Sequence, residues 1–129
     1  MNATGTFDVK LGPLPLADAT EGTLLARLSI DKHFHGDLDA TSKGEMLSAG
    51  TAVQGSAGYV AIERVSGTLD GRRGTFVLQH TGTMNRGVPD LSVTVVPDSG
   101  TAELAGLTGR MTIDIANGQH SYTFSYSLP

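Results

Sequence analysis

The feature that most constrains this 129-residue chain is a two-residue alternation of apolar and polar side chains, which recurs along its length. It is clearest in segment 121–128, where aromatic residues and a leucine alternate with serine and threonine. Alternation with a period of two is typical of a β-strand that buries one face. No window shows the spacing of an amphipathic helix, so we predict an all-β protein.

Short turns that contain glycine predict how these strands pair, because the length of a turn sets the register. Asn117-Gly118 and Asp70-Gly71 are both typical of two-residue hairpin turns, whose two positions need positive φ. A four-residue loop is predicted at 97–100 and a three-residue loop at 35–37. The predicted partners are Ile115 with His120, Ile113 with Tyr122, Met111 with Phe124, Val65 with Phe76, Glu63 with Leu78, Ala61 with His80, Tyr59 with Gly82, Val95 with Ala102, Val93 with Leu104, Phe34 with Leu38 and Lys32 with Ala40.

About eight strands in hairpin order, without helical crossovers, predict a closed antiparallel up-and-down β-barrel. Eight strands enclose a space that side chains or one small ligand can fill, and closure removes exposed strand edges. A β-sandwich is the alternative, because it allows the same hairpins. No linker or charge block divides the chain, so we predict a single domain over residues 1–129.

Composition excludes several classes of function. The net charge of -4 argues against nucleic-acid binding, which needs a concentrated basic face. The absence of cysteine excludes disulfides and thiolate metal sites. The first residues do not read as a signal peptide, and no apolar stretch is long enough for a membrane-spanning helix. We therefore expect a cytoplasmic protein that contacts no membrane.

Ionisable residues on the predicted inner face are the candidate catalytic residues. Glu63 lies between two apolar inward positions, and His80 is its diagonal neighbour on the next strand. A carboxylate in an apolar barrel should be paired or should have a raised pKa. Tyr59 lies on the same face, so the three residues form a candidate acid–base group for proton transfer. A purely structural Glu–His pair is the alternative reading.

The candidate ligand-binding residues share the same inner face. Lys32 could offset the carboxylate or bind an oxyanion, although it could also turn outward. His120 follows the Asn-Gly turn and belongs near the barrel mouth. The full candidate set is Lys32, Phe76, Leu78, His120, Tyr122 and Phe124. His33 and His35 face the other way and lack a third ligand, so we predict no metal and no other cofactor.

Five segments resemble the bacterial domain-of-unknown-function family 3224 (DUF3224): LLARLSIDKHFHGDL, SKGEMLSA, QGSAGYVAIERVSGTLDGRRGTFVLQHTGTM, LSVTVVPDSGTAELAGLTG and HSYTFSYSLP. That family looks like a distant relative of allene oxide cyclase, which has a calycin-like barrel. The pattern from Gly67 to Gln79 also looks like a strand turn of the plant cyclases. The resemblance implies a barrel with a cavity and assembly into homo-oligomers. It carries over no catalytic residue.

Three functions remain open. The barrel could bind a small apolar molecule without chemistry, or it could be an isomerase or cyclase acting on an epoxide or an enone. In the enzyme, Glu63 would be the acid or base, assisted by His80 and Tyr59. In the third possibility, side chains fill the interior and the protein acts only through its surface. An interior cavity of about 300 Å³ or more would favour the first two.

Overall fold

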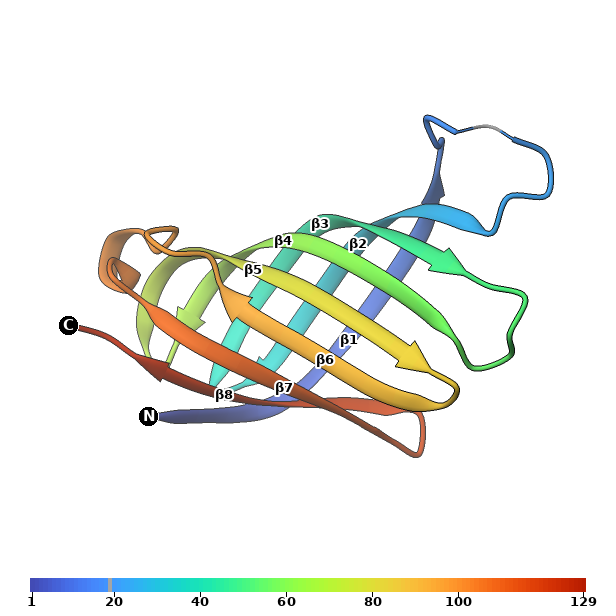
Figure 1. The fold of residues 1–129 in the computed structure, drawn as a ribbon. Helices are drawn as coiled ribbons and strands as arrows, with labels where there is room; N and C mark the ends of the chain where they lie inside the picture. Colours follow the sequence, from blue (N-terminus) through green and yellow to red (C-terminus); the bar gives the residue numbers. More distant parts are fainter. Residues whose placement is uncertain (19) are drawn as a thin grey trace.

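The computed structural model describes residues 1–18 and 20–129, and within them eight antiparallel strands close into one barrel (Figure 1). Each strand pairs with the next along the chain, and β1 also pairs with β8. The predicted up-and-down barrel is confirmed, and the sandwich is excluded. The strands are β1 (Asn2–Leu14), β2 (Leu25–Gly36), β3 (Leu38–Gly50), β4 (Ala57–Leu69), β5 (Arg72–Asn85), β6 (Val88–Val95), β7 (Thr108–Ala116) and β8 (Gln119–Ser127).

The two hairpins with two-residue turns have the predicted registers. Asn117 and Gly118 both have positive φ, as do Asp70 and Gly71, and in each turn the strands pair directly up to the flanking residues. A third turn of this kind, Arg86-Gly87, joins β5 to β6. All seven partners predicted across the first two turns are therefore confirmed.

The predicted pairing across the 97–100 loop is wrong. Val93 lies opposite Met111 rather than Leu104, and Ala102–Leu104 forms a short 3-10 helix. Leu104 and Leu107 are both buried in the core. Leu107 lies beyond this helix, and its amide donates to the Leu104 carbonyl across a turn in which Gly106 has positive φ. The turn returns Leu107 to the core, whereas a continuous strand would place two residues three apart on opposite faces.

The predicted register across the 35–37 loop is also wrong, by two residues. Phe34 lies opposite Ala40, and Lys32 lies opposite Ser42. The Tyr122 hydroxyl enters the turn, where it accepts a hydrogen bond from the Leu38 amide and donates one to the His35 carbonyl. This long-range contact widens the turn. A shift of two residues keeps each side chain on its original face, so Lys32 still points inward.

The barrel interior has one filled half and one open half. The filled half is packed by buried aromatic and aliphatic side chains, with Leu104 and Leu107 among them. Figure 1 shows both chain termini and the segment between β6 and β7 at this end, whereas the long β1–β2 and β3–β4 connections lie at the other end. In the described part of the chain, no helix is long and apolar enough to cross a membrane.

Candidate functional site

The fully buried carboxylate of Glu63 on β4 lies inside the barrel, and three polar side chains from the neighbouring strands β2, β3 and β5 meet around it. The Lys32 ammonium on β2 donates to Glu63 Oε2 over 2.8 Å, and His80 Nε2 on β5 lies 2.6 Å from the same oxygen. The Ser42 hydroxyl on β3 donates to the other oxygen, Oε1, over 2.8 Å. Each carboxylate oxygen is therefore hydrogen-bonded, which is what burial of a charge requires.

Gly44 makes the room in which Glu63 lies. It faces Glu63 directly across β3 and β4. A Cβ atom at Gly44 would lie 2.0 Å from the Ile62 carbonyl oxygen and 2.6 Å from the Glu63 Cα. Both are backbone atoms, which cannot rotate away as a side chain could. Only glycine therefore allows the two strands to approach this closely.

His80 continues the polar cluster toward Tyr59. The Tyr59 hydroxyl lies 3.1 Å from His80 Nδ1. When the neutral imidazole donates to Glu63 from Nε2, its Nδ1 accepts from the tyrosine hydroxyl. Gly82 faces Tyr59 across β4 and β5, and a Cβ there would lie 2.4 Å from Tyr59 Cε1. Glycine at this position therefore leaves space for the ring.

Glu63 is held as a carboxylate. Burial by itself raises the pKa of Glu63, but the hydrogen bond from His80 and the charge of Lys32 outweigh burial and lower the pKa to about 2. The sequence left two options open, a paired carboxylate or a raised pKa, and the structure has the paired one. Burial, together with the Glu63 charge, raises the pKa of Tyr59, so this hydroxyl keeps its proton.

A cavity of about 240 Å³ occupies the open half of the barrel, beside the polar cluster. The Lys32 ammonium lies 4.8 Å from the centre of the Phe7 ring, and the His120 ring lies 4.9 Å from that of Phe7. Most of the lining is apolar. The lining residues are Phe7, Val9, Leu11, Ile30, Lys32, Met46, Tyr59, Ala61, His80, Leu91, Ile113, Ile115 and His120.

The structure divides the candidate residues between the cavity and the core. Lys32, Tyr59, His80 and His120 line the cavity, whereas Glu63 lies behind Lys32 and His80 without lining it. The other four candidates pack in the filled half of the barrel and do not line the cavity, and their contact with a ligand stays a prediction. These four are Phe76, Leu78, Tyr122 and Phe124.

Sequence reasoning missed several residues that build the site. Ser42 was not identified, because no short turn in the sequence predicted how β3 pairs with β4, the pairing that brings Ser42 close to Glu63. Gly44 and Gly82 could have been found as glycines inside strands, since such glycines often mark a close approach of another group. The apolar residues at the cavity mouth follow the alternation, but sequence does not tell which end of a barrel is open.

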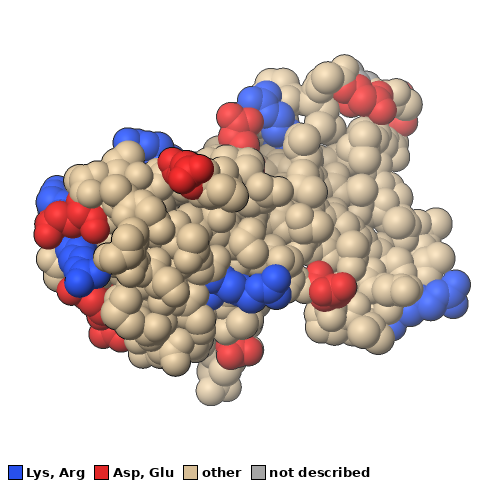
Figure 2. Space-filling model, turned by 60° about the vertical axis from the view of Figure 1, so that its left-hand side comes forward, with Lys and Arg blue, Asp and Glu red and all other residues tan. Residues whose placement is uncertain are grey.

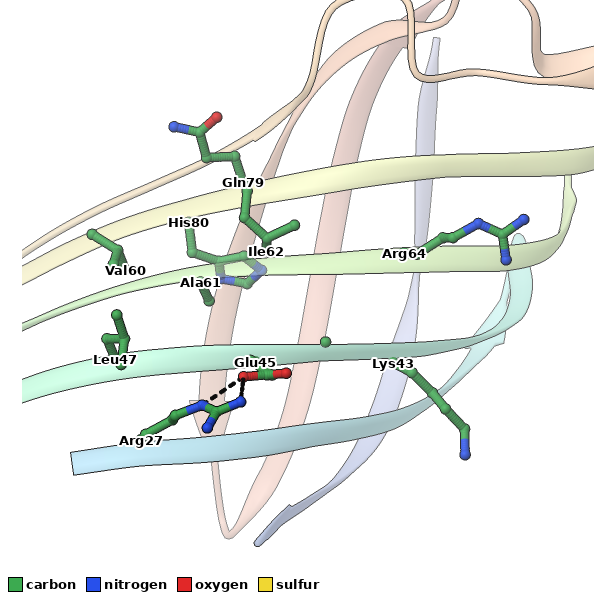
Figure 3. Close-up of a pocket in the computed structure, with 11 residues that line it drawn as sticks. Arg27, Lys43, Glu45, Leu47, Val60, Ala61, Ile62, Arg64, Gln79 and His80 are labelled. Atoms are coloured by element: carbon green, nitrogen blue, oxygen red, sulfur yellow. Dashed lines mark hydrogen bonds and ion pairs between the residues drawn. The ribbon is translucent and has the colours of Figure 1, made fainter. Parts of the chain in front are cut away.

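The outer surface carries a larger hollow over β3, β4 and β5, of about 650 Å³, where Arg27 pairs with Glu45 over 2.7 Å (Figure 3). Leu47, Val60 and Ile62 are about half exposed there. On the face drawn in Figure 2, acidic and basic side chains lie interspersed around broad uncharged areas. The lining of this hollow also includes Ala61 and His80, which line the interior cavity as well, so the two spaces meet at β4 and β5.

The two histidines at 33 and 35 lie on the outer face of β2. Their rings are 4.2 Å apart, and His35 Nε2 lies 3.0 Å from Asp8 Oδ2. Within residues 1–18 and 20–129, no three His, Asp or Glu side chains are grouped so that they could hold a metal ion.

Comparison with known proteins identifies relatives by both sequence and fold. The structure matches a crystallised protein of unknown function from the DUF3224 family of Shewanella oneidensis MR-1, with a TM-score of 0.95 and 55% identity. The match covers 100% of this chain and 97% of that protein. A comparison with curated proteins finds no match. The model of the family described as "Protein of unknown function (DUF3224)" matches residues 3–126, and this chain therefore belongs to the DUF3224 family.

Proposed function

We propose that the protein binds a small, mostly apolar molecule in the open half of its barrel. The observation that carries this proposal is the contrast between the two halves of the interior. One half is packed with side chains, whereas the other leaves about 240 Å³ lined mainly by apolar groups, with four polar residues at the edge. Concave, mostly apolar sites with few polar groups are the usual form of a small-molecule site.

The size of the cavity limits the ligand. Its volume of about 240 Å³ is below the roughly 300 Å³ at which we expect an interior cavity to favour binding or catalysis, so volume alone does not favour binding and any ligand must be small. A dry apolar cavity of about 150 Å³ is known to hold benzene, so this cavity has room for about ten non-hydrogen atoms. A single ring or a short branched chain fits this limit, whereas a long fatty acid could enter only in part.

Direct binding of a ring-sized probe tests the proposal. Saturation-transfer NMR with toluene should show binding to the wild-type protein and none to Ile113→Trp, which fills the cavity from β7. Leu47→Trp on the outer hollow is the matched control and should leave binding unchanged. Native mass spectrometry of freshly purified protein then searches for the natural ligand. Absence of toluene binding to the folded wild-type protein would contradict the proposal.

The chain of Tyr59, His80 and Glu63 supports a second candidate function, isomerisation of an enone. Tyr59 lines the cavity, and its hydroxyl is hydrogen-bonded to His80, which in turn is hydrogen-bonded to Glu63. The Tyr59 oxygen would take a proton from the α-carbon of the substrate while its own proton passes to His80 Nδ1. The reverse transfer would then deliver a proton to the γ-carbon, so that the double bond moves and the protein is regenerated.

In this mechanism Glu63 is a positioning residue rather than the acid or base, because its carboxylate is ionised, fully buried and hydrogen-bonded at both oxygens. Conversion of 3-cyclohexen-1-one to 2-cyclohexen-1-one, followed by ultraviolet absorbance, tests the candidate. Tyr59→Phe and His80→Gln should abolish the conversion, and Tyr126→Phe in the filled half should not. Equal rates with and without wild-type protein would contradict isomerase activity on this substrate. The expected homo-oligomer and the cytoplasmic location stay predictions.

A further inference from the structure

Lys32 is a buried ammonium with unused hydrogen-bonding capacity beside the cavity. It is 7% exposed and lies on the lining. An ammonium has three N–H donors, and the described residues give this one a single hydrogen bond, to Glu63. The ammonium also lies 4.8 Å from the centre of the Phe7 ring and 5.6 Å from that of the Phe34 ring. Ring faces attract the charge but leave the remaining donors without an oxygen acceptor.

The buried charges of Glu63 and Lys32 balance each other. The negative charge of Glu63 is paired with the positive charge of Lys32 over 2.8 Å. His80 and Tyr59 complete the hydrogen bonds of the cluster. A charged ligand would add an uncompensated charge to a low-dielectric interior, which is unfavourable. An uncharged oxygen acceptor would use the free donors of Lys32 without disturbing the balance.

From these two observations we infer that the site selects an uncharged ligand with a carbonyl oxygen, which accepts a hydrogen bond from the Lys32 ammonium. The inference rests on the proposed binding function and adds the chemical class of the ligand, a small cyclic or branched ketone or enone. In the bound state the carbonyl oxygen lies at Lys32 and the hydrocarbon part lies among the apolar side chains of the mouth. The same contact would polarise the carbonyl and acidify its α-carbon.

Four probes of similar size test the inference by calorimetry or NMR titration. They are cyclohexanone, its hydrocarbon counterpart methylenecyclohexane, cyclopentanecarboxylate and cyclohexylammonium. Wild-type protein should bind cyclohexanone about tenfold more tightly than methylenecyclohexane, the gain expected from a hydrogen bond to a charged donor. It should bind the two ions more weakly than either neutral probe. The infrared stretch of the bound ketone should move to lower frequency.

Two variants assign these effects to Lys32. Lys32→Met should remove both the tenfold preference and the infrared shift. Because that variant leaves the Glu63 charge unpaired and could unfold, Lys32→Met with Glu63→Gln removes both charges together and should give the same result. Lys43→Met, an exposed lysine on β3, is the matched control and should behave as wild type.

The outcomes separate the inference from the binding function. Equal affinity for ketone and hydrocarbon, or tighter binding of either ion, would overturn the inference and leave the binding function standing. An unshifted infrared band in the wild-type complex would also overturn it, even if neither variant folds. Failure of all four probes to bind the folded wild-type protein would remove both proposals.

Discussion

The imidazole of His80 lies 2.6 Å from the carboxylate of Glu63, although the two residues are not direct partners across β4 and β5. Glu63 faces Leu78, and His80 faces Ala61, so the contact is a diagonal one between positions of the same sheet face. Diagonal neighbours are close enough for long side chains to meet. The small side chain of Ala61 leaves the space across which the imidazole reaches.

Removal of the Glu63 charge should destabilise the protein in a pH-dependent manner. The pKa of Glu63 is about 2 in the fold against an ordinary 4.5, so the ionised form adds stability above pH 4.5 that is lost as pH falls toward 2. Glu63→Gln should therefore lower the free energy of unfolding by about 3 kcal/mol at pH 7. Urea denaturation at several pH values measures the free energy of unfolding, and the difference between variant and wild type should become smaller below pH 4.5. Glu45→Gln, at an exposed ion pair, should cost less than about 1 kcal/mol. If the difference in free energy of unfolding between Glu63→Gln and wild type stays constant down to pH 2, the assignment of Glu63 as a buried carboxylate is contradicted.

The glycine opposite Tyr59 should control the position of that ring. Gly82→Ala places a methyl group 2.4 Å from Tyr59 Cε1, so the tyrosine must rotate away from His80. We expect the fold to persist, because the obstructing atom belongs to a side chain that can move. The hydrogen bond between Tyr59 and His80 should be lost, which NMR of the His80 ring nitrogens would detect. Gly58→Ala is the control, since its nearest contact is an ordinary 3.6 Å. Unchanged His80 resonances in Gly82→Ala would refute this role of glycine.

The hydroxyl of Tyr122 should stabilise the β2–β3 turn. Tyr122→Phe leaves the Leu38 amide and the His35 carbonyl without their partner. Loss of a partner by a buried backbone group costs about 1–3 kcal/mol, and Leu38 is buried whereas the exposed His35 can turn to water. We therefore expect the free energy of unfolding to fall by about 1–3 kcal/mol. Tyr126→Phe should cost less, because its partner Asp70 is exposed and can turn to water. Thermal and urea denaturation compare the two variants. Equal decreases in the free energy of unfolding would contradict the proposed stabilisation of the β2–β3 turn by Tyr122.

The sequence was sufficient for those features that depend on local chemistry. Asn117-Gly118 and Asp70-Gly71 adopt their turns because few other residues tolerate positive φ at both positions, and each turn then sets the register of two strands. This register was enough to place Glu63, His80 and Tyr59 on one face. The alternation of apolar residues indicated which face is internal.

Tertiary structure decided the features that depend on residues far apart in the chain. The turn at 35–37 follows the Tyr122 hydroxyl, which lies more than 80 residues away, and the 3-10 turn at Ala102–Leu104 follows the burial of its leucine in the filled end. Lys32 and Ser42 reach Glu63 only because four strands curve around one interior. Local sequence specifies backbone conformations at turns, whereas a buried charge selects partners from every strand that surrounds it. The low pKa of Glu63, the open end of the barrel and the free donors of Lys32 therefore follow from closure of the barrel.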